Sequence, residues 1–328
     1  MKICIISTFL GQKLSGAEIS SYLLAETMSK KENVFVITTS INNNIKIRTK
    51  SLNLGWIPNQ ILMIGTFITD YLIFSKCLKF LEEEKPDIVH IQDFSILTPA
   101  LKACKKLNIP TFMTVRDYRF NCNLSIDLEN NKINRNYTIF TYIKWLFKTI
   151  QKTSNLSWLT PLFFPFFYYS NLNNIKSVHK VDRIITVSDY IKKELIKSNI
   201  PKDIIKTILV PHPNWEYHSF VHKKYIRIFT AGVLTESKGI DLLIKAMKKV
   251  ISKKFIIKLF IAGEGSYEGK LEQLVFKYKL EDHVVLLGRL NYKRMKTEYI
   301  NSDFVVVPSV WPEPLSRVII EAFTIGRP

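Results

Sequence analysis

The stretch that most constrains the fold begins at Asp303 and continues to residue 328. Residues 304–307 form a continuous apolar run of strand length, which is typical of a buried parallel strand. A turn with three prolines follows, and residues 315–323 then change to helical spacing, with Pro314 suited to the first helical position. The stretch therefore predicts a strand, a turn and a helix in close succession, as in an α/β sheet.

Two glutamates flank the start of this predicted helix. Glu313 lies at the helix mouth, and Glu321 lies eight residues further on, which at 1.5 Å per residue is about 12 Å deeper. The free N–H groups near Leu315 and Ser316 lie between them and can hold an anion. This arrangement suits a nucleotide-sugar, which presents sugar hydroxyls, a diphosphate and ribose hydroxyls. The alternative is a solvated loop glutamate and a helix-flank glutamate without a ligand.

The rest of the sequence alternates strand-like apolar runs with helical spacing, in two series. Residues 40–57 are polar and poor in pattern, so we expect a loop there. The alternation predicts an α/β protein with two doubly wound domains, 1–213 and 214–328, joined at a hinge that contains His212. Strands are expected at residues 2–7, 33–39, 88–91, 111–115, 181–188 and 204–210, and then at 226–231, 255–262, 284–287 and 304–307.

Size and charge limit the classes of function. The 328 residues suffice for two cores. The four cysteines show no metal spacing and no signal peptide is visible, which favours the cytoplasm. The net charge of +19 favours an anionic partner, either nucleic acid or an acidic membrane surface, unless it reflects a proteome rich in Lys, Ile and Asn. No nucleic-acid-binding module is recognisable, so nucleic acid is not an expected partner.

Residues 137–170, within an insert at about 120–178, concentrate aromatic side chains and lysines. The apolar positions recur at helical spacing, beside a stripe of lysines one turn apart. The apolar run is too short and too interrupted by proline to span a bilayer. It predicts an amphipathic segment on an anionic membrane, or else a cover for the first core. The two stripes are Phe140, Ile143, Phe147 and Ile150, and Lys144, Lys148 and Lys152.

Polar residues also collect where two strands of the first half are predicted to end. His90 and Gln92 follow one strand, and Arg116 and Asp117 follow the next. Ligands of open α/β sheets bind outside the carboxyl ends of the strands, so all four are candidates. The alternative for the last two is an ion pair at the end of a strand.

Several motifs resemble those of family 4 retaining glycosyltransferases. EPLSRVIIEA, after a VVVPS strand, resembles that family's E-x7-E motif, and AGVLTESKGIDLLIKA resembles its phosphate-binding segment, which includes Lys238. KPDIVHIQ and TFMTVRDYRFNC are similar to parts of its N-terminal domain. The loop and helix start that hold Gly16 and Glu18 look like its acceptor-side loop, although their glycine spacing does not fit a dinucleotide-binding motif.

The resemblance implies a GT-B architecture, in which two Rossmann-like domains face each other across a cleft and the second binds the donor. It implies hexosyl transfer with retention from a nucleotide-sugar to a glycan or lipid-linked acceptor, as in cell-surface polysaccharide biosynthesis, at the cytoplasmic face of the membrane. No cofactor or metal is expected. The implied catalytic residues are Glu313, Asp117 and Arg116, and the implied donor-binding residues are Lys238, Glu321, Leu315, Ser316, Gly232 and Arg289.

Three departures from the family pattern bear on the predicted activity. Arg116 stands where many members have histidine, and arginine cannot act as a base at pH 7. Val233 replaces a usual arginine, for which Arg317 or Arg289 would have to compensate. The sequence stops at Pro328, where the next strand of the family should begin, so we expect the second domain to be incomplete. The alternative function is therefore a truncated, inactive relative that binds only membrane or acceptor.

Overall fold

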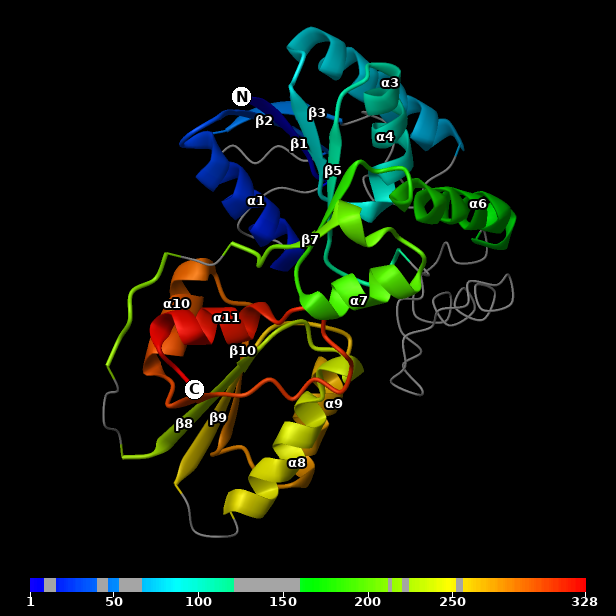
Figure 1. Cartoon of the computed structure of the whole chain (residues 1–328). Helices are drawn as coiled ribbons and strands as arrows, with labels where there is room; N and C mark the ends of the chain where they lie inside the picture. The colour runs from blue at the N-terminus through cyan, green and yellow to red at the C-terminus, as the bar shows by residue number, and fades with distance from the viewer. Residues whose placement is uncertain are drawn as a thin grey trace. The chain divides into compact units, whose positions relative to one another are not determined.

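Two parallel β-sheets, each with helices on both faces, make up the computed structural model (Figure 1). The structure describes residues 1–8, 16–39, 47–52, 67–120, 160–211, 214–219, 224–251 and 256–328. The described residues up to Pro211 form one compact unit, and those from Asn214 onward form a second. Most of the aromatic segment predicted to meet a membrane, residues 137–159, and the hinge residue His212 lie outside the described residues.

The first unit has a seven-stranded sheet in the order β3-β2-β1-β4-β5-β6-β7. The central strands are buried on both faces, which explains their continuous apolar sequences. The strands are β1 (Lys2–Ile6), β2 (Asn33–Thr38), β3 (Arg48–Ser51), β4 (Ile88–Ile91), β5 (Thr111–Val115), β6 (Arg183–Thr186) and β7 (Ile205–Thr207). The helices are α1 (Gly16–Ser29), α3 (Phe67–Glu84), α4 (Leu97–Lys106), α6 (Thr160–Val178) and α7 (Asp189–Lys197), with short 3-10 turns η1 (Phe94–Ile96) and η3 (Lys202–Ile204).

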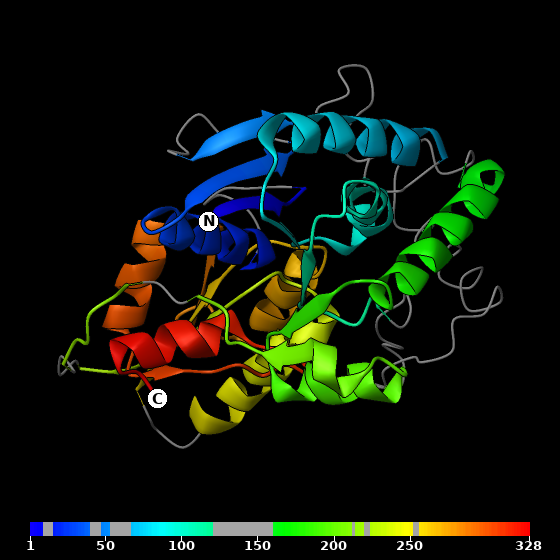
Figure 2. The ribbon, with the colours of Figure 1, turned by 45° about the horizontal axis from the view of Figure 1, so that its top comes forward.

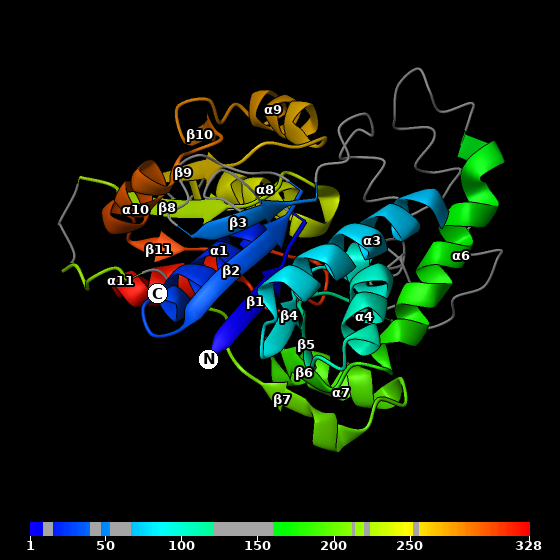
Figure 3. The ribbon, with the colours of Figure 1, turned by 90° about the horizontal axis from the view of Figure 1, so that it is seen from above.

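The two faces of β1 contact different helices. Ile3 and Ile5 pack with Tyr22 and Ala25 of α1 in one buried cluster. Cys4, which points to the other face, is completely buried. On that side α3, α4 and α6 lie next to one another, as Figures 2 and 3 show. The alternation of side chains along the strand therefore produces the double winding that the sequence predicts.

One prediction about the first unit was wrong. Residues 48–51 form strand β3, although we expected residues 40–57 to form a loop. β3 pairs only with β2, and an edge strand does not need an apolar sequence because one side of it stays in solvent. Pro161 and Pro165, which interrupt the apolar sequence, lie within the first two turns of a continuous helix, α6, from Thr160 to Val178. None of the helices in the described part of the chain is long and apolar enough to cross a membrane.

The second unit has a four-stranded sheet in the order β10-β9-β8-β11. Figure 1 shows α8 and α9 on one face of this sheet and α10 and α11 on the other. Each pair of helices covers its own buried apolar cluster. The elements are β8 (Ile226–Ala231), η4 (Glu236–Lys238), α8 (Ile240–Ile251), β9 (Ile257–Ala262), α9 (Glu268–Lys277), β10 (Val284–Gly288), α10 (Tyr292–Asn301), β11 (Phe304–Val305) and α11 (Arg317–Ile325).

The prediction of a buried strand at residues 304–307 was also wrong in part. β11 has only two residues and lies at the edge of the sheet, where Phe304 is 48% exposed. On one side, Val306 N–H donates to the carbonyl of Phe229 at 2.9 Å. On the other side, Val305 N–H donates to the carbonyl of Pro328 at 2.9 Å. The helix that follows begins at Arg317, so Pro314 precedes it and Ser316 is its N-cap residue.

Candidate functional site

A glycine turn after β8 places Lys238 beside the loop that follows β11. Gly239 has φ +64, and a Cβ atom there would lie 2.1 Å from the carbonyl oxygen of Pro308. Only glycine therefore permits this close approach. Val310 N–H donates to the carbonyl of Ser237 at 3.0 Å, which fixes the loop against the turn. Because β8 and β11 are neighbours in the sheet, residues far apart in sequence meet at their carboxyl ends.

Glu313 lies in this loop and receives several hydrogen bonds. Lys238 Nζ is 2.5 Å from Glu313 Oε1. Trp311 Nε1–H donates to the same oxygen at 3.3 Å, and the Ser309 hydroxyl also donates to it. Among the described residues, the hydrogen bonds to Glu313 thus all end on Oε1. The second oxygen, Oε2, keeps its capacity to accept hydrogen bonds from a ligand.

The charge on Glu313 is stabilised by these neighbours. Burial alone would raise the pKa of the carboxyl group, but the hydrogen bonds from Lys238 and Ser309 outweigh burial, and the pKa lies below its usual value. Lys238 Nζ also lies 5.7 Å from the centre of the Trp311 ring. At neutral pH the site therefore holds a carboxylate and an ammonium group that neutralise one another.

Glu321 is held in a different way, in the second turn of α11. Its carboxylate is buried and accepts one hydrogen bond on each oxygen. Arg317 Nη2 donates to Oε1 at 3.0 Å, and the Tyr299 hydroxyl donates to Oε2 at 2.8 Å. Burial, followed by the nearby charge of Glu321, raises the pKa of Tyr299 well above its usual value, so the tyrosine stays protonated and donates.

The other predicted donor-binding residues have different surroundings. Leu315 is half-buried and Ser316 is buried, and both precede α11, so the free N–H groups of its first turn belong to residues 317–319. Gly232 is half-buried directly after β8. Arg289 is exposed and follows β10, which two strands separate from β11.

The carboxyl ends of the first sheet hold a second polar cluster. Arg116 follows β5, and its guanidinium donates to the side-chain oxygen of Gln92, which follows β4. Its Nη1 also donates to the Ser21 hydroxyl of α1 at 3.2 Å. The structure thus brings together two predicted candidates and one residue, Ser21, that the sequence did not indicate. The helix containing Ser21 begins with the predicted acceptor-side residues Gly16 and Glu18.

Asp117 and His90 are engaged within the protein. Arg119 donates to Asp117 through its backbone N–H at 2.9 Å and its side-chain Nε at 2.8 Å. Burial opposes ionisation of Asp117, but the charge and hydrogen bonds of Arg119 outweigh it and lower the pKa. His90 Nε2 lies 2.8 Å from the Thr114 hydroxyl, and burial lowers its pKa to about 3. Neither group is suited to accept a proton at pH 7.

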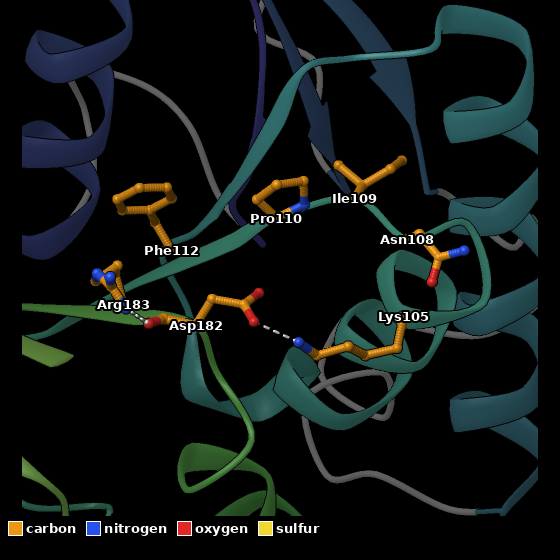
Figure 4. A pocket seen from close by; sticks show the side chains of 7 residues that line it. All are labelled: Lys105, Asn108, Ile109, Pro110, Phe112, Asp182 and Arg183. Atoms are coloured by element: carbon orange, nitrogen blue, oxygen red, sulfur yellow. Dashed lines mark hydrogen bonds and ion pairs between the residues drawn. The ribbon is translucent and has the colours of Figure 1, made fainter.

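A cavity of about 500 Å³ lies at the amino ends of β5 and β6 in the first sheet (Figure 4). The ion pair between Lys105 Nζ and Asp182 Oδ1, 2.6 Å long, crosses one side of it. Asp182 also accepts hydrogen bonds from the N–H and hydroxyl of Thr111. The cavity is thus remote from the carboxyl ends, where Gln92 and Arg116 lie.

Besides Ser21, four other residues contact the predicted site residues and were not predicted from the sequence. Ser309 and Trp311 lie inside the recognised loop, and their donor groups were a usable signal. Arg119 lies two residues after Asp117, a spacing that permits a local ion pair. Tyr299 carried no usable signal, because its contact with Glu321 arises only from the packing of α10 against α11.

Two family models together match nearly the whole chain. Residues 14–209 match the model described as glycosyltransferase family 4. Residues 214–328 match the model described as glycosyl transferases group 1. The two matches correspond to the two compact units of the structure.

Curated relatives are similar to part or all of this chain. An uncharacterized glycosyltransferase of Methanocaldococcus jannaschii is 35% identical over 167 residues, which cover 46% of this chain and 42% of that protein. The chain spans less than half the length of this relative and of two others. An uncharacterized 42.6 kDa protein of the cps region of Klebsiella pneumoniae is 25% identical, over 100% of this chain and 84% of that protein.

Solved structures agree on the GT-B fold. The Anabaena protein HepE, in complex with UDP and glucose, has a TM-score of 0.66 at 15% identity, over 100% of this chain and 79% of that protein. Because the alignment includes the whole chain, the comparisons do not support the prediction that the second domain is incomplete. The fold, the two matched family models and the Lys238–Glu313 pair agree, and the chain belongs to glycosyltransferase family 4.

Proposed function

We propose that this chain transfers a hexosyl group, with retention of configuration, from a nucleoside-diphosphate sugar to a glycan or lipid-linked acceptor. The observation that carries the proposal is the contact of Lys238 with Glu313 at the carboxyl ends of β8 and β11. In the transfer, the bond between the anomeric carbon and the diphosphate breaks, and the nucleoside diphosphate leaves with the bonding electrons. The same carbon forms a bond to the acceptor oxygen, whose proton passes to the departing diphosphate.

The second unit offers one group for each part of such a donor. The ammonium group of Lys238 has three N–H donors, so it can hold Glu313 with one and a phosphate oxygen with another. The free N–H groups at the start of α11 add a further phosphate site. In this proposal Glu313 Oε2 accepts a hydrogen bond from a sugar hydroxyl, and Glu321 accepts hydrogen bonds from the ribose.

The first unit offers a cationic acceptor site. Arg116 is permanently charged, so we assign it to an anionic group of the acceptor, such as a phosphate, and not to proton transfer. Asp117 has a lowered pKa and is bound to Arg119, so we propose that it positions this region. Gly16 and Glu18 would flank the acceptor from the start of α1.

The reaction is proposed to need no metal, because Lys238 and the N–H groups of α11 supply positive charge to the leaving diphosphate. UDP in the HepE complex supports a nucleotide-sugar donor. Retention rests on the resemblance of the E-x7-E motif. The net charge of +19 supports a peripheral position on the anionic inner face of the membrane.

The decisive experiment mixes the protein with UDP- and GDP-hexoses and follows nucleotide release, with and without EDTA. Turnover that resists EDTA and is lost in Glu313→Gln supports the proposal, and the anomeric proton of the product reports retention. Loss of turnover with EDTA would contradict the metal-free reaction. Nucleotide binding without turnover on any donor or acceptor tried would favour the alternative of an inactive binding protein.

Membrane binding is tested separately by co-sedimentation with vesicles. We expect pelleting with anionic phosphatidylglycerol vesicles that weakens as salt rises, because surface charge interactions are screened. Neutral phosphatidylcholine vesicles are the control. Equal pelleting with both vesicles, or with neither, would contradict a peripheral membrane position.

A further inference from the structure

We infer that Tyr299 is a positioning residue that orients the Glu321 carboxylate and thereby makes donor recognition selective for ribose over 2′-deoxyribose. The inference rests on the proposed function, in which Glu321 meets the ribose hydroxyls. It adds a residue of α10 that does not itself touch the donor. The inference rests on the packing that fixes the Tyr299 ring and on the two hydrogen bonds that the Glu321 carboxylate accepts.

The Tyr299 ring is fixed on two sides. The side chain is completely buried, and its hydroxyl lies 2.8 Å from Glu321 Oε2. Phe229 of β8 meets it edge-to-face, with the ring centres 5.1 Å apart. Trp215 also packs against the Tyr299 ring, with the ring centres 5.7 Å apart. Packing on both sides leaves the ring little freedom, so the position of the hydroxyl is defined by the core of the second unit.

The segment that supplies Trp215 is itself held by α11 and the residues after it. Arg327 is almost completely buried, and its guanidinium donates to the carbonyls of His218 at 2.6 Å, Ser219 at 3.1 Å and Ile300 at 2.8 Å. The Tyr217 ring lies so close to Gly326 that an added Cβ would be 2.4 Å from it. These contacts keep residues 214–219 against α10 and α11, and therefore keep Trp215 against Tyr299.

The Glu321 carboxylate retains acceptor capacity after both bonds are made. A carboxylate has about four lone-pair sites. Among the described residues, Tyr299 and Arg317 use one on each oxygen. The remaining sites can accept two hydroxyl groups, as a ribose presents. Because the Tyr299 hydroxyl bond fixes the plane of the carboxylate, it also fixes the directions of those free sites.

Selectivity follows from the burial of this carboxylate. A buried acceptor that is built to receive a hydroxyl group is left unpaired by an analogue without it, and such sites reject the analogue strongly. If the carboxylate can rotate, it can turn its free sites elsewhere and the penalty falls. Loss of the Tyr299 hydroxyl should therefore reduce the preference for ribose more than it reduces binding of the 2′-deoxy analogue.

The test measures calorimetric affinities for ADP, CDP, GDP and UDP, and then for the 2′-deoxy form of the tightest binder. We expect the wild-type protein to favour the ribonucleotide about 10- to 100-fold. Tyr299→Phe keeps the ring, and should lower this ratio to about threefold or less with unchanged affinity for the 2′-deoxy form. Tyr292→Phe, in the same helix and also against Trp215, is the matched control and should keep the ratio.

Each outcome separates the inference from the function beneath it. A wild-type ratio in Tyr299→Phe, or an equal loss of affinity for both nucleotides, overturns the positioning role. Glu321→Gln should abolish the ratio, and if it does not, the assignment of Glu321 to the ribose fails. A wild-type protein that binds none of the four nucleotides overturns both the inference and the proposed function.

If Tyr299→Phe does not fold, Glu321→Asp is the second variant. The shorter side chain withdraws the carboxylate from the Tyr299 hydroxyl and should lower the ratio, and an unchanged ratio overturns the inference.

Discussion

The loop before α11 and the helix itself each hold one glutamate, and the two carboxylates are bound in opposite ways. Glu313, in the loop, receives Lys238, Ser309 and Trp311 on a single oxygen. Glu321, in the helix, receives one donor on each oxygen. The loop therefore keeps one oxygen for a ligand and has redundant neutral donors, whereas the helix uses each donor once.

This difference predicts which substitutions matter. In the loop, the loss of a neutral donor leaves two other donors on Glu313 Oε1. The loss of Lys238, the single cation among them, leaves the partly buried Glu313 carboxylate without a counter-charge. In the helix, no donor has a substitute, so any change to the carboxylate breaks a bond. Loss of the cation, Lys238, should therefore have the largest effect, and a change to the helix glutamate, Glu321, the next largest. Protonation of the loop glutamate, Glu313, should have a smaller effect, and loss of a neutral donor in the loop the smallest.

Lys238→Ala should have the largest effect. It removes the charge-assisted bond to Glu313 and, under the proposed function, a phosphate contact, so nucleoside-diphosphate affinity should fall by about 100-fold or more. Lys245→Ala is the matched control, because Lys245 forms an exposed i,i+4 ion pair with Asp241 at 2.8 Å. Such surface pairs contribute little, so its affinity should change by less than about threefold. Equal losses in both variants, measured by calorimetry, would refute the special role of Lys238.

Glu321→Gln should come next, with a clear loss of stability. The amide can still contact the Tyr299 hydroxyl, but it leaves the half-buried Arg317 without its carboxylate. The free energy of unfolding should fall by about 1–3 kcal/mol. Urea denaturation measures it, with the exposed Glu272→Gln of α9 as control. A stability equal to that of the wild type would mean that the helix carboxylate is not held as tightly as its two bonds indicate.

Some of the strands and site residues were predictable from the sequence. Strand runs such as residues 3–6 and 34–37 were recognisable because burial on both faces demands a continuous apolar sequence. Lys238 and Glu313 stood out because their motifs resemble those of a known family. β3 was not predictable, because its polar sequence has one strand neighbour and no core face to mark it.

The hydrogen-bond donors to each of the two carboxylates were not predictable either. Tyr299 and Glu321 are 22 residues apart, and only the packing of α10 on α11 brings them together. The predicted start of the last helix was early, because helical spacing begins before the backbone has left the proline-rich loop. The motifs thus pointed to Glu313 and Glu321, but the sequence did not indicate which of their carboxylate oxygens remain available.

The pH dependence of stability should separate the loop glutamate from the rest of the protein. The neighbours of Glu313 lower its pKa despite burial, so its contribution to stability is complete above its ordinary pKa of 4.5 and is lost as the pH falls through the lower folded value. The stability difference between wild type and Glu313→Gln should therefore shrink below about pH 4.5. His90, whose pKa is lowered to about 3, titrates in both proteins and cancels. A difference that grows on acidification would mean that the neighbours do not lower this pKa.

Trp311→Phe should have the smallest effect. The indole N–H bond to Glu313 Oε1 is long, at 3.3 Å, and Lys238 and Ser309 occupy the same oxygen. Phenylalanine keeps an aromatic face near Lys238 Nζ, although its cation–π attraction is weaker. The indole N–H is one of three donors to Oε1 and is neutral. Its loss should weaken nucleotide binding by about 0.5–1 kcal/mol, which corresponds to an affinity about two- to fivefold lower. Calorimetric titration beside Lys238→Ala measures both effects on one scale. A loss in Trp311→Phe as large as that in Lys238→Ala would show that the donors on Oε1 act as one unit, and the loop would then be as intolerant as the helix.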